Sequence, residues 1–202
     1  ETYGIRGVGI TVSVEQKNLA ERLIAQKGLT DVIEIRLQDY RETDDGPYDA
    51  IVSIGMFEHV GFKNYRTYFE KARALLKPDG LFLLHTIGMN RTTYAAEPWI
   101  NKYIFPNGCL PSPSQIGAGI DGLFVMEDWH NFGPDYDKTL MRWYENFEKT
   151  WPEIRAKYGD RFYRMWRLYL LSMAGNFRAR TMNLWQIVLS PGGVEGGYRS
   201  VR

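Results

Sequence analysis

Residues 49–61, with the sequence DAIVSIGMFEHVG, place a carboxylate and an imidazole shortly after an apolar run. The run from Ala50 to Ile54 is short and bounded by turn residues, which is typical of a strand buried on both faces of a parallel sheet. Glu58 and His59 follow it. Ligands of open α/β sheets bind outside the carboxyl ends of the strands. We therefore predict that Glu58 belongs to a catalytic site and that the residues before it line a cofactor pocket.

The segments that would position Glu58 alternate between strands and helices. Apolar and β-branched runs predict strands at residues 5–12, 32–37, 49–55 and 81–87. Helical patterns lie between them, one after residue 13 and one from about residue 64. Alternation with short connections is typical of a doubly wound parallel sheet, and α/β is the fold class that we predict.

The two predicted helices have recognisable ends and apolar faces. Ser13 and Gln16 form a possible capping box for the first, which would end at Gly28. We expect this helix to bury Leu19, Leu23 and Ile24. The second would be ended by Pro78 and Gly80 and would place six side chains on one face: Tyr65, Tyr68, Phe69, Ala72, Leu75 and Leu76.

The chain changes character after Gly88. Residues 97–119 are aromatic and rich in Pro, Gly and Ser, which favours a cover over a cleft rather than a core element. A strand at 123–129, helices at about 136–158 and 161–177, and a last strand at 181–190 are expected to follow.

Composition narrows the class of protein. The chain has 202 residues, 44% of them hydrophobic and 24% charged, which suits one globular domain. A net charge of +1 gives no global reason to expect nucleic acid. The single Cys109 excludes an internal disulfide and a cysteine-built zinc site, and we predict no metal. No apolar run approaches the ~18 residues of a transmembrane helix and no signal peptide is visible, so we expect a cytoplasmic protein.

The glycine-rich turn of nucleotide-binding α/β domains is missing from the start of the sequence. No G-x-G-x-x-G occurs there, and Gly4, Gly7 and Gly9 lie within the first expected strand. Either the ligand is not a nucleotide, or the chain begins after that turn.

Several long motifs resemble one enzyme family, from about residue 3 to the end of the chain. In order they are GITVSVEQ, RLQDY, IVSIGMFEHVG, LLHTIG, WINKYIFPNGCLPS, MEDWHNFGPDYDKTL and GNFRARTMNLWQIVLS. Together they resemble the cyclopropane-fatty-acyl-phospholipid synthases, to which the mycolic acid cyclopropane synthases are related.

The resemblance implies a fold and an activity. Members are S-adenosylmethionine-dependent methyltransferases with a Rossmann-like fold, which methylate a cis double bond of an unsaturated acyl chain and close it to a cyclopropane. Relative to that pattern the first strand and its Gly-rich turn are lacking, so residues 1–202 are expected to be the C-terminal part of the catalytic domain. Such a fragment alone is expected to bind the cofactor poorly and to be inactive.

The resemblance also assigns the catalytic residues. Glu58, His85, the backbone of Ile87, and Tyr136 would form a cradle for bicarbonate, which serves the family as general base. Glu58 can accept a hydrogen bond from the bicarbonate hydroxyl, while His85 and Tyr136 can donate to its oxygens. Without the resemblance, other interpretations stay open: a helix-capping carboxylate, a core histidine and a surface aromatic. We interpret His59 as structural.

Cofactor contacts carry over to two segments, each of which follows a predicted strand. The first is Thr11, Val12, Ser13 and Gln16, with Gln16 in the position that holds the ribose hydroxyls. The second is Gln38 and Asp39, which suit recognition of the adenine edge. Ser13 and Gln16 can also serve as the capping box, and the two roles do not exclude each other.

Aromatic side chains could stabilise the positive charge that methyl transfer leaves on carbon, by roughly 0.5–2 kcal/mol. Candidates are Trp99, Tyr103, Phe105, Trp129 and Phe132, although core packing is the alternative for each. Near GNFRAR, where relatives often carry a cysteine, this chain has Met173, whose thioether cannot act as a nucleophile. Cys109 is expected to be a bystander.

The expected partners are phospholipid acyl chains at the inner face of the membrane, with a possible homodimer in the full-length enzyme. A basic and aromatic helical stretch could lie on anionic lipid or could be a solvated face: Arg155, Lys157, Arg161, Arg164 and Arg167 with Phe162, Trp166 and Leu170. Two other functions remain open, a related methyltransferase with a methyl-branched product and a non-catalytic module.

Overall fold

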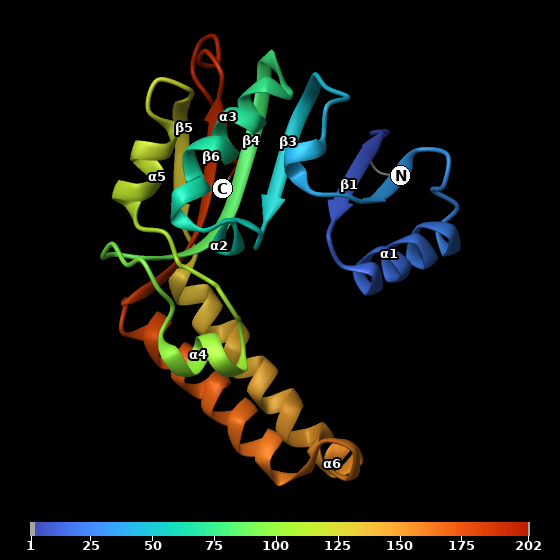
Figure 1. The fold of residues 1–202 in the computed structure, drawn as a ribbon, viewed down its shortest axis with the longest axis vertical. Coiled ribbons are helices and arrows are strands. Elements are labelled where there is room, and N and C mark those ends of the chain that lie inside the picture. The colour runs from blue at the N-terminus through green and yellow to red at the C-terminus, as the bar shows by residue number, and fades with distance from the viewer. Residues whose placement is uncertain (1–2, 202) are drawn as a thin grey trace. The chain divides into compact units, whose positions relative to one another are not determined.

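The computed structural model describes residues 3–201 of the chain. It contains two compact units, Glu1–Gly46 and Pro47–Arg202. Figure 1 shows the order of their elements along the chain.

The first unit is a small βαβ motif. Strands β1 (Gly7–Thr11) and β2 (Ile33–Leu37) pair in parallel, with Gly7 opposite Ile33 and Thr11 opposite Leu37. Helix α1 (Val14–Gln26) connects them, and the short 3-10 helix η1 (Tyr40–Glu42) follows β2. The hydroxyl of Ser13 caps α1 by accepting from the N–H of Gln16 at 3.2 Å, which confirms one half of the predicted capping box. The other half is absent, because the side chain of Gln16 accepts from the hydroxyl of Thr11 instead.

The prediction that α1 buries an apolar face is wrong. No residue of α1 is buried, and Leu19 and Leu23 are about half exposed, at 50% and 48%. Two strands and one helix offer too little surface to enclose such a face.

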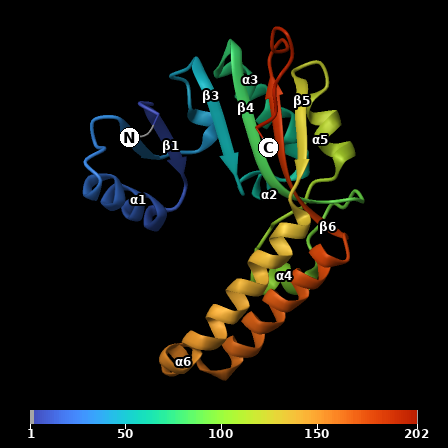
Figure 2. The ribbon, with the colours of Figure 1, turned by 180° about the vertical axis from the view of Figure 1, so that it is seen from behind.

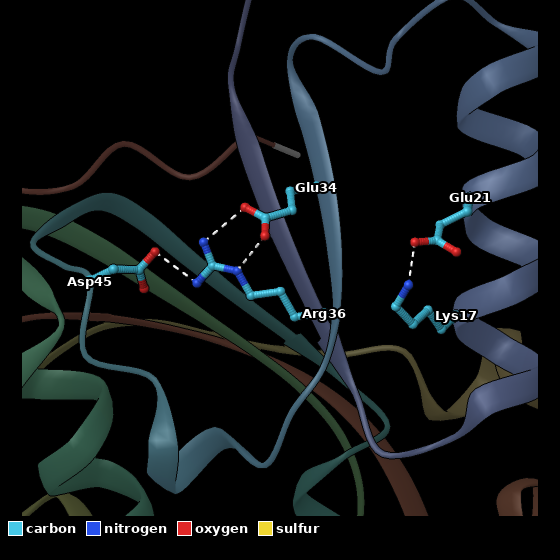
Figure 3. Close-up of polar contacts among 5 residues, drawn as sticks. All are labelled: Lys17, Glu21, Glu34, Arg36 and Asp45. Atoms are coloured by element: carbon cyan, nitrogen blue, oxygen red, sulfur yellow. Dashed lines mark hydrogen bonds and ion pairs between the residues drawn. The ribbon is translucent and has the colours of Figure 1, made fainter.

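Figure 3 shows ion pairs between charged side chains of this unit. The guanidinium of Arg36 donates hydrogen bonds to both carboxylate oxygens of Glu34 and to Oδ2 of Asp45, each at 2.8 Å. Lys17 pairs with Glu21 one turn along α1. Such exposed pairs contribute little to stability, because water screens them.

The second unit contains a four-stranded sheet in the order β3-β4-β6-β5. The strands are β3 (Tyr48–Ile54), β4 (Leu76–Met89), β5 (Val125–Asn131) and β6 (Met182–Ser190). Strands β3 and β4 are parallel, whereas β6 is antiparallel to both β4 and β5. The class α/β is confirmed, but a fully parallel sheet is wrong, because the sheet is mixed. The prediction that the apolar run forms a strand buried on both faces is also wrong, because Val52 and Ile54 of β3 are 59% and 69% exposed.

The antiparallel direction of β6 follows from the helical segment that precedes it. Helix α6 (Gly133–Arg178) is two helices joined at Gly159, whose φ of 73° lies in the region that favours glycine. It runs out from the sheet and back, as Figures 1 and 2 show. The chain therefore re-enters the sheet at the end where it left β5, with Trp185 opposite Asn131, and must run the other way.

Strand β4 begins earlier than we predicted. Helix α3 (Tyr65–Ala74) ends before Leu75, and Leu76 already belongs to β4, so placing these two leucines in the helix was wrong. Register shifts between the pairs Tyr48–Leu76 and Ala50–Leu81, which accommodates Pro78 in an irregular stretch of strand.

One face of the sheet packs against an aromatic core. Phe57 stacks on Tyr65 with ring centroids 4.1 Å apart and contacts Phe69 at 5.2 Å, while Phe82 and Leu84 of β4 are fully buried. Four α3 positions predicted to face inward are buried: Tyr65, Tyr68, Phe69 and Ala72. The remaining short helices are α2 (Phe57–Val60), η2 (Phe62–Asn64), α4 (Pro98–Tyr103) and α5 (Pro113–Ile120).

A second core fills the α6 hairpin, against which α4 lies (Figures 1 and 2). Its buried members include Leu140, Phe147, Leu170 and Phe177, and Phe162 and Trp166 pack against them. The aromatic half of the basic stretch is therefore core, while Arg161, Arg164 and Arg167 are exposed. No helix within residues 3–201 is both long enough and apolar enough to cross a bilayer.

Three asparagines join the ends of β4, β5 and β6 at the base of α6, and we call them the asparagine chain: Asn90, Asn131 and Asn183. The amide of Asn183 accepts from Asn131 and donates to Asn90, both at 2.9 Å. Asn131 also accepts from the N–H of Gly133 at 2.9 Å, and Asn90 donates to the carbonyl of Arg180 at 2.8 Å. Asn183 is only 2% exposed, so water cannot reach its amide in the folded protein. The hydrogen bonds to Asn131 and Asn90 take the place of those that the amide makes to water in the unfolded chain.

Candidate active site

Glu58 lies immediately after the carboxyl end of β3, as the apolar run predicted. Gly55, at φ 64°, ends that strand with a turn that a side chain would strain, and α2 starts two residues later. Glu58 is buried, at 8% exposure. Its Oε1 accepts from the backbone N–H of Ile87 at 2.8 Å. Its Oε2 has no hydrogen-bond partner among the described residues.

Burial raises the pKa of Glu58, since an ionised carboxylate loses hydration there. The N–H of Ile87 opposes this shift by donating to the carboxylate, while the hydroxyl of Thr86 donates to the carbonyl of Ile87. The cost of leaving one carboxylate oxygen unpaired is therefore only partly offset. Such a buried acceptor is suited to a polar ligand.

A cavity of about 860 Å³ borders Glu58. Its wall is mostly apolar and includes Ile87, Met89, Trp99, Ile100, Leu110, Leu140, Leu168, Tyr169, Met173, Phe177 and Met182. Few polar side chains join them: Glu58, His59, Thr93, Glu97, Tyr136, Ser172 and Asn176. His59, which we interpreted as structural, therefore also borders the cavity. A mostly apolar cavity of this size with a few polar groups can hold a long apolar ligand and orient one polar part of it.

Tyr136 reaches the same cavity from the first turns of α6. Its ring packs edge-on against Phe177, with centroids 5.0 Å apart. Burial raises the pKa of Tyr136, and the charge of Glu58 raises it further. The phenol therefore stays protonated and remains a hydrogen-bond donor beside the carboxylate.

Two other predicted catalytic residues come from β4. Ile87 lines the cavity, but its N–H is already engaged by Glu58, so in this structure it orients the carboxylate. His85 lies two residues earlier on the same face of β4 and is not among the residues that line the cavity. Its Nδ1 is 3.1 Å from Nε2 of Gln186, and burial lowers the pKa of His85.

The predicted cofactor residues gather at the carboxyl ends of β1 and β2 in the first unit. The N–H of Gln38 donates to the carbonyl of Thr11 at 2.9 Å, which holds the two strand ends together. The hydroxyl of Thr11 donates to Oε1 of Gln16 at 2.7 Å. Val12 is 77% exposed. The carboxylate of Asp39 is held by Arg41, which lowers the pKa of Asp39 to about 2.

The predicted aromatic residues divide into two groups. Trp99 and Phe105 line the cavity, and Tyr103 packs against Trp99 with centroids 5.7 Å apart. Trp129 instead packs on Trp185 at 5.1 Å, and Phe132 on His130 at 3.8 Å, so core packing describes both better.

The cavity-lining residues of the second α6 helix were not predicted from the sequence, where Met173 was noted only at the position of a cysteine in relatives. Tyr169, Met173, Asn176 and Phe177 recur every three or four residues and so share one face. An apolar face interrupted by polar Ser172 and Asn176 was the available signal. Cys109 is buried, its thiol pKa is raised by that burial, and it has no place in the cavity wall.

No group of three or more potential metal ligands occurs within the part of the chain that the structure describes. Beside its apolar surface, the cavity presents the carboxylate of Glu58 and the phenol of Tyr136 together with a few other polar side chains.

Known methyltransferases share this fold. A coclaurine N-methyltransferase, bound to N-methylheliamine and SAH, superposes with a TM-score of 0.76 over 92% of this chain and 58% of its own, at 23% identity. The mixed α/β sheet is accordingly that of the Rossmann-like S-adenosylmethionine-dependent methyltransferases.

More similar proteins identify the family. The family described as mycolic acid cyclopropane synthetase matches residues 1–187, and the chain belongs to it. A mycolic acid cyclopropane synthase complexed with SAH and CTAB is 29% identical, with a TM-score of 0.83 over 93% of this chain and 70% of its own. The cyclopropane-fatty-acyl-phospholipid synthase of Escherichia coli K12 is 56% identical over 99% of this chain and 51% of its own length.

A related enzyme with another name is less similar to this chain than the Escherichia coli synthase is. A tuberculostearic acid methyltransferase of Mycobacterium tuberculosis is 36% identical over 89% of this chain and 44% of its own length. The chain thus spans about half the length of these curated relatives.

Proposed function

We propose that the chain serves methylene transfer from S-adenosylmethionine to the cis double bond of unsaturated phospholipid acyl chains, which forms cyclopropane fatty acids. The observation that carries the proposal is Glu58, a buried carboxylate with one oxygen unpaired at the wall of a large apolar cavity. The 56% identity to the Escherichia coli synthase supports this substrate class.

The cavity suits the acyl chain. A double bond is apolar and offers no hydrogen bonds, so only apolar contact can hold it, and the wall supplies that contact. The rings of Trp99, Phe105 and Tyr169 would also stabilise positive charge on a carbon atom of the chain. The same wall keeps water from that carbon.

Glu58 fits a small anion that carries one hydroxyl, and bicarbonate has this form. Oε2 of Glu58 would accept from the hydroxyl, and the phenol of Tyr136 would donate to an oxygen. A protonated nitrogen of His85 is the further proposed donor, although His85 is not among the residues that line the cavity. Bicarbonate would supply the base for ring closure. Glu58 thus holds the base and is not itself the base, which keeps a strong nucleophile away from a sulfonium methyl.

S-adenosylmethionine would supply the electrophilic methyl group. In the first unit, Thr11, Val12, Ser13 and Gln16 are the proposed contacts, together with Gln38 and Asp39. The amide of Gln16 fits a ribose hydroxyl, because Thr11 fixes its oxygen and leaves its N–H groups free to donate. Asp39 fits less directly, because Arg41 already engages both of its oxygens.

We further propose that residues 1–202 belong to a methyltransferase catalytic domain that acts at the inner face of the cytoplasmic membrane. A homodimer of the whole enzyme remains part of this proposal. The exposed Arg161, Arg164 and Arg167 are compatible with an anionic lipid surface, and they are equally compatible with solvent.

One experiment tests the function. The protein is incubated with S-adenosylmethionine carrying a ¹³C-methyl group, with bicarbonate and with vesicles of an unsaturated phospholipid, and released fatty acids are analysed by mass spectrometry and NMR. For the whole enzyme we expect a ¹³C-labelled ring methylene, and for residues 1–202 alone we expect no labelled product. A labelled methyl branch would favour the alternative methyltransferase.

Absence of any labelled product, together with no binding of S-adenosylhomocysteine in calorimetry, would identify the chain as non-catalytic by itself. Calorimetric binding without product would instead separate cofactor binding from catalysis.

A further inference from the structure

His85 and Gln186 form a cross-strand pair in the middle of the second sheet. They lie directly opposite each other on the antiparallel strands β4 and β6, and such pairs point to the same face. Nδ1 of His85 is 3.1 Å from Nε2 of Gln186, within hydrogen-bond distance. Both side chains are partly buried, so water does not freely replace this bond.

The protonation state of His85 determines what its contact with Gln186 does. Burial lowers the pKa of His85 below its ordinary value, so the imidazole is neutral near pH 7. A neutral imidazole has one protonated nitrogen and one acceptor nitrogen. Only one of its two tautomers can therefore donate a hydrogen bond from a given nitrogen.

We propose that Gln186 is a positioning residue that holds His85 in the Nε2–H tautomer. The amide N–H of Gln186 donates to Nδ1 of His85, which leaves the only imidazole proton on Nε2. Nδ1 is thereby occupied, and Nε2–H is the group that can donate to an anion. The inference rests on the proposed role of His85 as an anion donor, although the tautomer itself can be measured independently of that role.

The surroundings of the pair offer little competition for Nδ1. On the other side of β4 the register places Ile54 of β3 opposite His85, and an isoleucine side chain can neither donate nor accept. Beyond Gln186 the register places His130 of β5, so Gln186 lies between two histidines. The assignment of its amide nitrogen to the His85 side is what selects the tautomer.

Tautomers are read directly from ¹⁵N–¹H correlation spectra of the histidine side chains. The chain contains three histidines, His59, His85 and His130, so each signal is assigned with a single substitution. At pH 7.5 we expect His85 to give the Nε2–H pattern alone. An Nδ1–H pattern in the unsubstituted protein would overturn the proposal.

Two substitutions then move the tautomer in opposite senses. Gln186→Glu presents only acceptor oxygens and should shift His85 to Nδ1–H or to the charged form, while Gln186→Met should leave a mixture. Gln115→Glu, in the capping box of α5, is the matched control and should change none of the three histidines. Unchanged His59 signals show that a variant is folded, and an unchanged His85 pattern in a folded Gln186→Glu variant also overturns the proposal.

The functional consequence is measured as bicarbonate dependence of product formation. We expect Gln186→Glu to raise the bicarbonate concentration for half-maximal rate about tenfold and Gln186→Met to raise it less. Equal effects of both variants would indicate a merely structural role and contradict the inference. If the whole enzyme forms no product, the proposed function fails, while the spectra still decide whether Gln186 sets the tautomer.

Discussion

Asn183 of the asparagine chain and Glu58 are both buried and polar, yet they satisfy their hydrogen bonds in opposite ways. Asn183, at 2% exposure, gives and accepts a hydrogen bond through its amide at 2.9 Å. Glu58, at 8% exposure, has one oxygen bonded to the N–H of Ile87 and the other unpaired within residues 3–201.

This difference in hydrogen bonding separates a residue that supports the fold, Asn183, from a residue of the candidate active site, Glu58. A buried amide that is paired on both sides, as that of Asn183 is, helps to fix one arrangement of the backbone, here the junction of three strands with α6. An unpaired buried acceptor lowers stability unless a ligand completes it. Substitutions in the asparagine chain should therefore change stability, and substitutions at the cavity should change chemistry.

The largest expected effect is on catalysis. Glu58→Gln keeps an oxygen for the N–H of Ile87 but puts an N–H group where Oε2 would accept from an anion. We expect product formation to fall by roughly 10²–10³-fold, with binding of S-adenosylhomocysteine changed little. Rates and calorimetry measure the two quantities.

Glu97→Gln is the matched control, because Glu97 also lines the cavity but its carboxylate caps α4 by accepting from the N–H of Ile100. It should keep the rate within about twofold, since an amide oxygen can replace that cap. Equal loss of rate and of cofactor binding in Glu58→Gln would show that Glu58 belongs with the structural support instead.

The next effect is on stability. Asn183→Ala leaves the amide of Asn131 and the carbonyl oxygen of Asn90 without their partner and removes buried packing. We expect the free energy of unfolding to fall by about 2 kcal/mol in urea titrations, with the rate per folded molecule unchanged.

Asn64→Ala provides the comparison on the surface, because its amide bonds to the carbonyl of Val60 in an exposed position. Its unfolding free energy should stay within about 0.5 kcal/mol of the unsubstituted protein. A similarly small change in the unfolding free energy for Asn183→Ala would remove the distinction between Asn183 and Glu58.

A smaller catalytic effect is expected at Tyr136. Tyr136→Phe removes one hydrogen-bond donor beside Glu58 and keeps the ring against Phe177, so the rate should fall about tenfold while stability is retained. Tyr144→Phe is the control, because Tyr144 packs against the same α6 core but does not line the cavity. Equal rates for the two variants would contradict a role for the Tyr136 phenol.

The sequence predicted the elements well where a local signal specified them. The apolar run before Gly55 specified β3 and placed Glu58 at its end, and the Ser13 cap specified the start of α1. The direction of β6 could not be predicted in this way, because it depends on the α6 hairpin returning the chain to the end it left. That return is set by packing between residues far apart in sequence.

The site was predicted in part for the same reason. Glu58 and Tyr136, 78 positions apart, were paired through resemblance to a family, since no local pattern connects them. The pairing of His85 with Gln186 requires the register of β4 against β6, which no single strand specifies. Likewise, the apolar face of α1 predicted burial, but burial requires a covering surface that the first unit does not contain.

The smallest effect concerns stability and pH at Glu58. Its pKa is raised by burial, so the folded protein holds this proton more tightly than the unfolded chain does. Any stability associated with the protonated carboxyl is complete below the unfolded pKa of about 4.5 and is lost as the pH rises through the folded pKa. Glu58→Gln, which cannot ionise, should therefore be more stable than the unsubstituted protein at pH 7.5 and no more stable at pH 4.

Urea titrations at the two pH values measure this difference, which should be smaller than the effect of Asn183→Ala and opposite in sign. Millimolar bicarbonate should narrow the gap at pH 7.5, because a ligand that binds the folded state stabilises it by mass action. Bicarbonate should leave the stability of the Glu58→Gln variant unchanged. If bicarbonate stabilised both proteins equally, the unpaired oxygen of Glu58 would not be its binding partner, and the contrast with the asparagine chain would reduce to stability alone.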